Sequence, residues 1–172
     1  MSPNIWGPSI WTLFHALAEQ IKEDRFQETR TYLFQFITKI CWHLPCPDCT
    51  MHAKQYLDRV NIYNVRTKEQ FRHFLWNFHN NVNKRKNKSL YDPSMLSTKY
   101  GQISLIQCFN NFINVYKTTG NMRLMTDGFQ RQFIVSGLRK WLTRNLGNFE
   151  RIPYASPNSP NPNPKSQTTT VS

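Results

Sequence analysis

Cysteine is scarce in this chain of 172 residues, and long hydrophobic runs are absent. Its four cysteines are too few for a secreted scaffold of this size that disulfides hold together. No stretch approaches the roughly 20 apolar residues that a membrane-spanning helix needs. The N-terminus also lacks the basic and apolar regions of a secretory signal. We therefore expect a soluble protein that has no transmembrane segment and is not secreted.

Acidic residues are also few, with 10 Asp and Glu against 22 Lys and Arg, which gives a net charge of +12. A positive field of this kind attracts nucleic acids, anionic membranes and acidic proteins. The densest basic run, residues 84–88, directly follows a polar segment at residues 79–83. A phosphate-bearing cofactor explains this placement as well as a nucleic acid does.

Apolar residues recur at helical spacing in four N-terminal segments. The spacing predicts a first helix with Pro8 in its first turn, a second helix over about residues 27–42, and a third that begins near Cys46. A fourth helix begins after Thr67, which has Gln70 three residues later as in a capping box. Four helices with short connections indicate an all-α helical bundle.

The rest of the chain divides into a helical region and a polar tail. Residues 94–150 carry further helical patterns, which Gly120 and Gly128 punctuate. Residues 151–172 are rich in Pro, Asn, Ser and Thr, and they bury too little apolar surface to offset the entropy of ordering. We expect a bundle over residues 1–93, a helical extension over residues 94–150 and a disordered tail.

Two cysteines separated by two residues, Cys46 and Cys49, have the spacing of a redox-active dithiol. Pro47 between them suits the first turn of a helix. Backbone N–H groups and the helix dipole at such a terminus favour a thiolate and lower the pKa of the attacking thiol. Zinc sites and thioredoxin-like enzymes use the same spacing, so the pair alone does not identify the chemistry.

A zinc site is the alternative that this segment leaves open. Cys41, Cys46, Cys49 and His52 supply three sulfurs and one nitrogen. Combined with the positive charge, they would form a basic, zinc-stabilised module that binds nucleic acid. The spacing argues against this module, because a closed tetrahedral site usually draws two ligand pairs from separate segments and no second pair is present.

The fourth predicted helix carries a polar and aromatic face. His79 and Asn83 lie one turn apart, with Asn80 beside them and Trp76 three residues before His79. Aromatic rings stack and amides form hydrogen bonds at ring edges, so this face suits a planar heteroaromatic ligand. A face that is simply exposed to solvent explains the same pattern.

Together, these residues resemble the FAD-linked sulfhydryl oxidases of the Erv/ALR family. The resemblance covers about residues 4–93, and this compact version with few cysteines is similar to the enzymes of large cytoplasmic DNA viruses. The residues that carry it are Trp6-Gly7-Pro8-x-x-Trp11 with His15, Cys46-x-x-Cys49 with His52 and Ala53, and His79-Asn80-x-Val82-Asn83 with Lys88 and Tyr91.

The resemblance implies an up-down four-helix bundle with a short fifth helix, FAD at one end and a homodimer through the first two helices. Cys46 and Cys49 would be the catalytic disulfide, with Cys49 next to the flavin and Cys46 facing the substrate. The residues that the resemblance assigns to the FAD site are Trp6, Gly7, Trp11, His15, Cys49, His52, Tyr56, His79, Asn80, Val82, Asn83, Lys86, Lys88 and Tyr91.

The resemblance also implies a two-electron cycle. A substrate thiolate attacks Cys46, a second substrate thiol releases the reduced pair, and Cys49 passes the electrons to FAD. Molecular oxygen then reoxidises the flavin and yields hydrogen peroxide. The substrates would be protein dithiols or a partner redox protein, and nucleic acid is not expected as a partner. The expected location is the cytoplasm, that of the host for a viral protein, or the virion.

Two features depart from the family pattern. Cellular relatives carry a structural disulfide before the fourth helix, where this chain has Arg66, and a second dithiol in a flexible arm, for which no cysteines remain. Cys41 and Cys108 are predicted to be small buried apolar residues, with a bridge between them as the open alternative. Substrate thiols are therefore expected to reach Cys46 directly.

Overall fold

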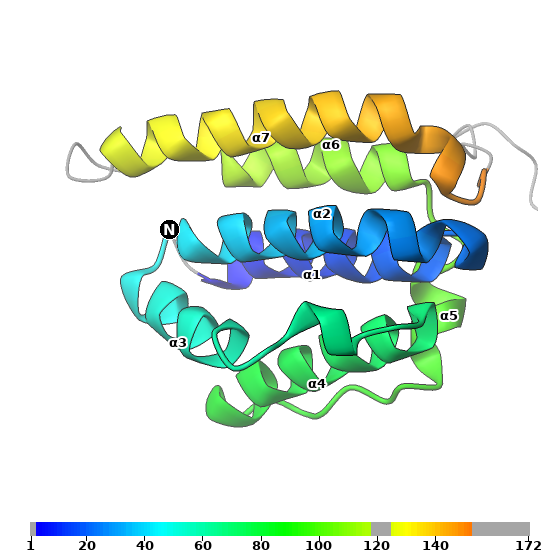
Figure 1. Ribbon diagram of the computed structural model, residues 1–172. Coiled ribbons are helices and arrows are strands. Elements are labelled where there is room, and N and C mark those ends of the chain that lie inside the picture. Colours follow the sequence, from blue (N-terminus) through cyan, green and yellow to red (C-terminus); the bar gives the residue numbers. More distant parts are fainter. Residues whose placement is uncertain (1–2, 118–124, 153–172) are drawn as a thin grey trace, which may run out of the picture.

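The computed structural model describes residues 3–117 and 125–152, and the regular elements in these ranges are helices plus one isolated β-bridge (Figure 1). The all-α prediction is confirmed. The predicted disordered tail lies outside the described residues except for its first two residues, as does Gly120. None of the described helices is both long and apolar enough to cross a membrane.

The N-terminal half contains the four predicted helices: α1 (Pro3–Gln20), α2 (Glu23–Trp42), α3 (Pro47–Leu57) and α4 (Lys68–Arg85). A single 3-10 turn, η1 (Ile62–Asn64), lies between α3 and α4. The predicted starts of α3 and α4 are confirmed.

Two predicted helix starts were too late. Pro8 lies inside α1 rather than in its first turn. Pro8 is the sixth residue of α1, so the helix lacks one N–H at this position and forms one fewer backbone hydrogen bond there. Helix α2 begins at Glu23, and Glu23 and Asp24 in its first turn interact favourably with the positive end of the helix dipole.

The C-terminal half contains α5 (Met95–Tyr100), α6 (Leu105–Tyr116) and α7 (Met125–Asn145), followed by a 3-10 turn, η3 (Leu146–Asn148). The prediction of further helices in this region is confirmed. Gly128, which was expected to separate helices, instead lies inside α7. The domain boundary after residue 93 stays a prediction, and α5 packs directly against α1 beyond it.

The helices form three layers (Figure 1). Helices α1 and α2 form the middle layer, α3 and α4 lie on one side of it, and α6 and α7 lie on the other. Six consecutive residues of α1, from Leu13 to Ala18, are buried. A helix that is buried all round must have neighbours on every side, so α1 is the centre of the core.

The turn between α1 and α2 is tied to the C-terminal half by several hydrogen bonds. The Gln20 side-chain amide donates to the carbonyls of Tyr100 and Ile103, at 2.9 and 2.7 Å. The Glu150 N–H donates to the Gln20 carbonyl at 2.7 Å, and Ile21 forms an antiparallel bridge with Phe149. Residues far apart in the sequence therefore close one end of the molecule together.

The start of α4 has the predicted capping box. The Gln70 N–H donates to the Thr67 hydroxyl at 3.1 Å, and the Thr67 N–H donates to the Gln70 side-chain oxygen at 3.3 Å. This arrangement satisfies two backbone donors that would otherwise have no partner at the start of the helix.

Replacing Thr67 by alanine removes half of this capping box. We expect the substitution to cost about 1 kcal/mol of unfolding free energy, which lowers the Tm by about 2–4 °C in a domain of this size. Thermal unfolding followed by circular dichroism measures the change. Thr143→Ala, at an exposed position inside α7, is the matched control and should leave the Tm nearly unchanged. Equal shifts in the two variants would contradict a capping role.

Candidate active site

Cys46 and Cys49 form a disulfide at the start of α3, as predicted, with their Cα atoms 5.2 Å apart. Cys46 is the N-cap residue, and its sulfur accepts a hydrogen bond from the Cys49 N–H at 3.2 Å. Pro47 occupies the first turn, where its missing N–H costs nothing. The N-cap position of Cys46 and the first turn of α3 therefore bring the two sulfurs together.

A cavity of about 560 Å³ lies next to this disulfide. Its wall comes from α1, the end of α2 and the link to α3, α3, the end of α4, and α5 with the segment that leads into it. Cys49 belongs to this wall and Cys46 does not. The volume falls in the range of about 300–1,000 Å³ that is typical of small-molecule and cofactor sites.

Most of the residues assigned to the FAD site from the sequence lie on the wall of this one cavity. Eleven of the fourteen do so: Trp6, Gly7, Trp11, Cys49, His52, His79, Val82, Asn83, Lys86, Lys88 and Tyr91. Three do not: His15, Tyr56 and Asn80.

Asn80 supports the wall from behind rather than lining it. Its side-chain amide donates to the Tyr91 carbonyl at 3.0 Å, and its side-chain oxygen accepts from the Tyr91 N–H at 2.7 Å. The Trp76 indole N–H donates to the same carbonyl at 2.7 Å. These three bonds hold Tyr91 against the cavity after the chain has left α4.

Tyr56 lies between α3 and α4. Its ring stacks on Phe78 with centroids 4.6 Å apart, and burial raises the pKa of its hydroxyl. Phe78 is itself a wall residue, so Tyr56 is one side chain removed from the cavity.

His15 is fully buried behind His79. The Nε2 atom of His15 and the Nδ1 atom of His79 are 3.0 Å apart, so one of the two nitrogens donates a hydrogen bond to the other. The His79 ring stacks on Trp11, with centroids 4.1 Å apart and ring planes 7° from parallel. His15 also stacks on Tyr100, at 4.9 Å. The histidine pair therefore sits in an aromatic cluster at the cavity wall.

Both histidines are neutral at pH 7. Burial, together with the charges of His79 and Lys99, lowers the pKa of His15 to about 3. Burial, together with Lys99 and Lys88, lowers the pKa of His79 to about 4. The pair therefore offers hydrogen-bonding groups without a charge.

The wall also contains residues that the sequence reasoning did not select. Lys99 and Tyr100 come from α5, beyond the predicted end of the bundle, and the Lys99 ammonium lies 4.9 Å from the centroid of the Tyr91 ring. Arg85 belongs to the basic run at the end of α4, and this run could have identified it from the sequence as a candidate for the site. The other wall residues that were not assigned to the FAD site are Pro3, Asn4, Pro8, Ile10, Thr12, Phe14, Cys41, Leu44, Ala53 and Phe78.

Two features of the wall fit a large aromatic cofactor with phosphates. Four cationic side chains, Arg85, Lys86, Lys88 and Lys99, contribute to it. The indole N–H of Trp6 is buried on the same wall without a hydrogen-bond partner among the described residues. A buried donor of this kind calls for an acceptor, because an unmade hydrogen bond costs about 1–3 kcal/mol.

The zinc alternative lacks a ligand set. The described residues include all four candidate ligands, and no group of three or more His, Cys, Asp or Glu side chains among them could hold a metal ion. Cys46 and Cys49 are joined to each other, whereas Cys41 is a buried free thiol.

The two remaining cysteines do not form a bridge. Cys41 and Cys108 are both buried free thiols, which confirms that they act as small apolar residues. Burial raises the pKa of Cys41, and it raises the pKa of Cys108 to about 11. Neither thiol is therefore ionised enough near pH 7 to attack a disulfide.

The lowered pKa values of the two histidines predict a specific loss of stability in acid. The unfolded chain protonates them near pH 6.5, whereas the folded chain keeps them neutral until pH about 4 for His79 and about 3 for His15. Unfolding therefore takes up protons, and the free energy of unfolding falls as the pH drops below 6.5, by about 1.4 kcal/mol per pH unit for each histidine.

Urea unfolding between pH 4.5 and 7.5 measures this dependence. His79→Gln should flatten the curve relative to the wild type, because the variant has lost one of the two groups. His73→Gln, at an exposed position on the same helix, is the control and should keep the wild-type slope. Identical slopes in all three proteins would contradict the conclusion that His79 contributes to the loss of stability in acid.

Comparison with known proteins agrees with this site. The model of the Erv1/Alr family matches residues 8–101, which is more than half of the chain. The FAD-linked sulfhydryl oxidase of African swine fever virus (isolate Tick/Malawi/Lil 20-1/1983) is 31% identical over 116 residues, covering 62% of this chain and 97% of the relative. Protein 347L of Invertebrate iridescent virus 6 is 32% identical over 106 residues, covering 58% and 96%.

A cellular protein is also similar. The mitochondrial FAD-linked sulfhydryl oxidase ERV1 of Saccharomyces cerevisiae is 28% identical over 86 residues, covering 50% of this chain and 45% of the relative. No solved structure matches the chain. Because the family match spans the helices and the disulfide that build the cavity, this chain belongs to the Erv1/Alr family.

Proposed function

We propose that this chain is an FAD-dependent sulfhydryl oxidase. It oxidises protein dithiols to disulfides through Cys46 and Cys49, and bound FAD carries the two electrons to molecular oxygen, which yields hydrogen peroxide. The observation that supports this function best is the position of the disulfide: Cys49 lies on the cavity wall, and Cys46 lies off it.

The cavity has the groups that FAD needs. The stacked Trp11 and His79 rings offer a flat aromatic surface, and the neutral His79 offers a ring nitrogen for hydrogen bonding. Lys88 and Lys99 on the cavity wall would supply positive charge for the pyrophosphate. The Trp6 indole N–H would find its missing acceptor on the cofactor.

The cysteines exchange with substrate in two balanced steps. A substrate thiolate attacks the Cys46 sulfur, which forms a mixed disulfide and releases Cys49 as a thiolate. A second substrate thiolate then attacks the substrate sulfur of that mixed disulfide, and Cys46 leaves as a thiolate. The substrate has lost two electrons and gained a disulfide, and both cysteines of the enzyme are reduced.

The start of α3 assists both departures. Cys46 already accepts a hydrogen bond from the Cys49 N–H, and this donor remains available when Cys46 becomes a thiolate. Both sulfurs lie in the first turn, where the helix dipole favours negative charge. The N-terminus of α3 therefore makes each cysteine a better leaving group.

Substrates approach from the outer side of the disulfide. A second depression of about 510 Å³ has Pro47, the residue that follows Cys46, on its wall, together with Trp42 and Met51. Trp42 and Met51 are exposed. The sequence contains no further dithiol, because Cys41 and Cys108 are buried singly. A protein dithiol, or a partner redox protein, therefore delivers electrons to Cys46 without an internal relay.

The location and the oligomeric state of the protein are predictions from the family resemblance. Many of the similar proteins are viral, and a location in the host cytoplasm or in the virion stays a prediction. The homodimer through the first two helices also stays a prediction, and the packing of α6 and α7 argues for a different arrangement.

Alanine at either active cysteine should abolish turnover. In Cys46→Ala and in Cys49→Ala, oxygen uptake with dithiothreitol should fall by roughly 100-fold or more, because the exchangeable disulfide is gone. Oxygen-electrode assays measure the rate, and the visible absorption spectrum reports whether flavin stays bound. Cys108→Ala is the control and should retain the wild-type rate. A colourless wild-type protein that stays colourless with added FAD would overturn the proposed function.

Lys99 should contribute to FAD affinity although it lies outside the predicted bundle. Because it supplies a charge at the cavity wall, Lys99→Ala should weaken FAD binding by about tenfold, or roughly 1.4 kcal/mol. Fluorescence titration of the apoprotein with FAD gives the Kd. Lys140→Ala removes the same charge at an exposed position on α7, a helix that does not contribute to the cavity wall, and should leave the Kd unchanged. An equal loss of FAD affinity in both variants would show that the overall positive charge matters and not the position of Lys99.

A further inference from the structure

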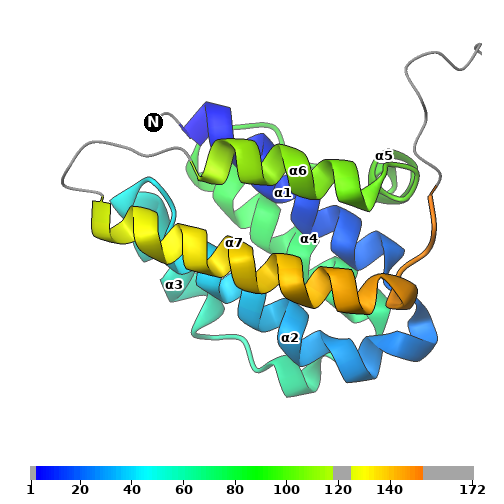
Figure 2. The same ribbon diagram turned by 90° about the horizontal axis from the view of Figure 1, so that it is seen from above.

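Helices α1 and α2 are covered on the side that faces away from α3 and α4. Helices α6 and α7 lie across them, as Figure 2 shows from above. The face of α6 that packs into the core is entirely apolar apart from the Tyr116 hydroxyl. Its buried residues are Leu105, Cys108, Phe109, Phe112, Ile113 and Tyr116.

Specific contacts join this cover to α2. The Tyr116 hydroxyl, fully buried on α6, donates a hydrogen bond to the Ile40 carbonyl at 3.1 Å. The Trp141 ring on α7 lies 5.6 Å from the Phe36 ring and 6.3 Å from the Tyr32 ring. The cover therefore has a defined position with respect to α2.

The end of α7 is fixed to the middle layer as well. The Lys22 N–H donates to the Asn148 carbonyl at 2.9 Å, and the Lys22 ammonium donates to the Gly147 carbonyl at 2.9 Å. Phe149 is buried beside Ile21 and forms the β-bridge with it. The segment before α6 and the segment after α7 are thus both anchored at the same end of the molecule, through Gln20 and Lys22 respectively.

The cover comes from a part of the chain that the family match does not include. The match ends at residue 101, whereas α6 begins at Leu105. The African swine fever virus relative is aligned over 97% of its length but only 62% of this chain. The residues that cover α1 and α2 are therefore additional to the part of the chain that identifies the family.

We infer that α6 and α7 take the place of a second subunit, so that this oxidase works as a single chain. An apolar helix face must be buried against another element, and here the chain's own helices bury it. A stable dimer needs about 800 Å² from each partner, and the outer faces of α1 and α2 are already occupied.

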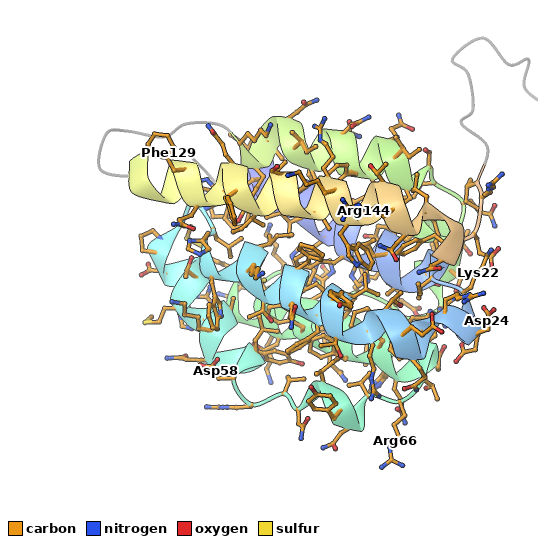
Figure 3. All side chains as sticks on the ribbon, turned by 45° about the horizontal axis from the view of Figure 1, so that its top comes forward. Lys22, Asp24, Asp58, Arg66, Phe129 and Arg144 are labelled. Carbon is orange, nitrogen blue, oxygen red and sulfur yellow. A yellow bond between two sulfur atoms is a disulfide. The ribbon has the colours of Figure 1, made fainter. Side chains whose placement is uncertain are left out.

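The mass of the full-length protein in solution tests this inference without reference to activity. Sedimentation velocity between about 1 and 100 μM should give the mass of one 20.5 kDa chain, plus any bound flavin, at every concentration. A mass of two chains would overturn the inference. This includes a dimer through the exposed Phe129 and Phe133 on the outer side of α7; Figure 3 shows Phe129 near the start of that helix.

A pair of variants on α7 tests whether the cover is seated in solution. Trp141→Ala removes the ring that packs on α2 and should lower the Tm by about 5 °C or more. Phe133→Ala, on the same helix with a side chain that is 79% exposed, is the matched control and should change the Tm by less than about 2 °C. Equal Tm values for the two variants would overturn the inference even if the protein is a monomer.

Discussion

The chemistry of this protein depends on how α3 begins. Because Cys46 caps the helix and Cys49 lies one turn inside it, the two sulfurs are bonded yet face different surroundings. Cys49 lies on the cavity wall, whereas Cys46 does not. The proposed two-step exchange needs this separation, since in it one sulfur meets a protein substrate and the other meets the cofactor.

The cavity is held open by residues that do not line it. Asn80 and Trp76 fix the backbone of Tyr91, and His15 packs behind His79. Their positions follow from the burial of α1, which brings His15 into the centre of the core. The aromatic surface offered to the cofactor is therefore an extension of the core packing, and its geometry is only as rigid as that packing.

Much of this site could be predicted from the sequence, because its residues lie on helices with regular spacing. The capping box at Thr67, the disulfide and eleven of the fourteen assigned residues illustrate this. The family resemblance assigned His15, Tyr56 and Asn80 to the FAD site, but helical spacing does not distinguish a residue on the wall from one directly behind it. The amphipathic face of α6 indicates that it is buried but not against which helix, so its packing on α1 could not be predicted from the sequence.

The bridge between Ile21 and Phe149 has a practical consequence for work with this protein. It ties the last described residues to the turn between α1 and α2, at the end of the molecule opposite the start of α3 (Figure 1). An affinity tag or a fluorescent protein fused after this point would begin far from Cys46. The disulfide would then stay accessible to large substrates, so fusion proteins at this terminus are suited to capturing mixed disulfides from cells.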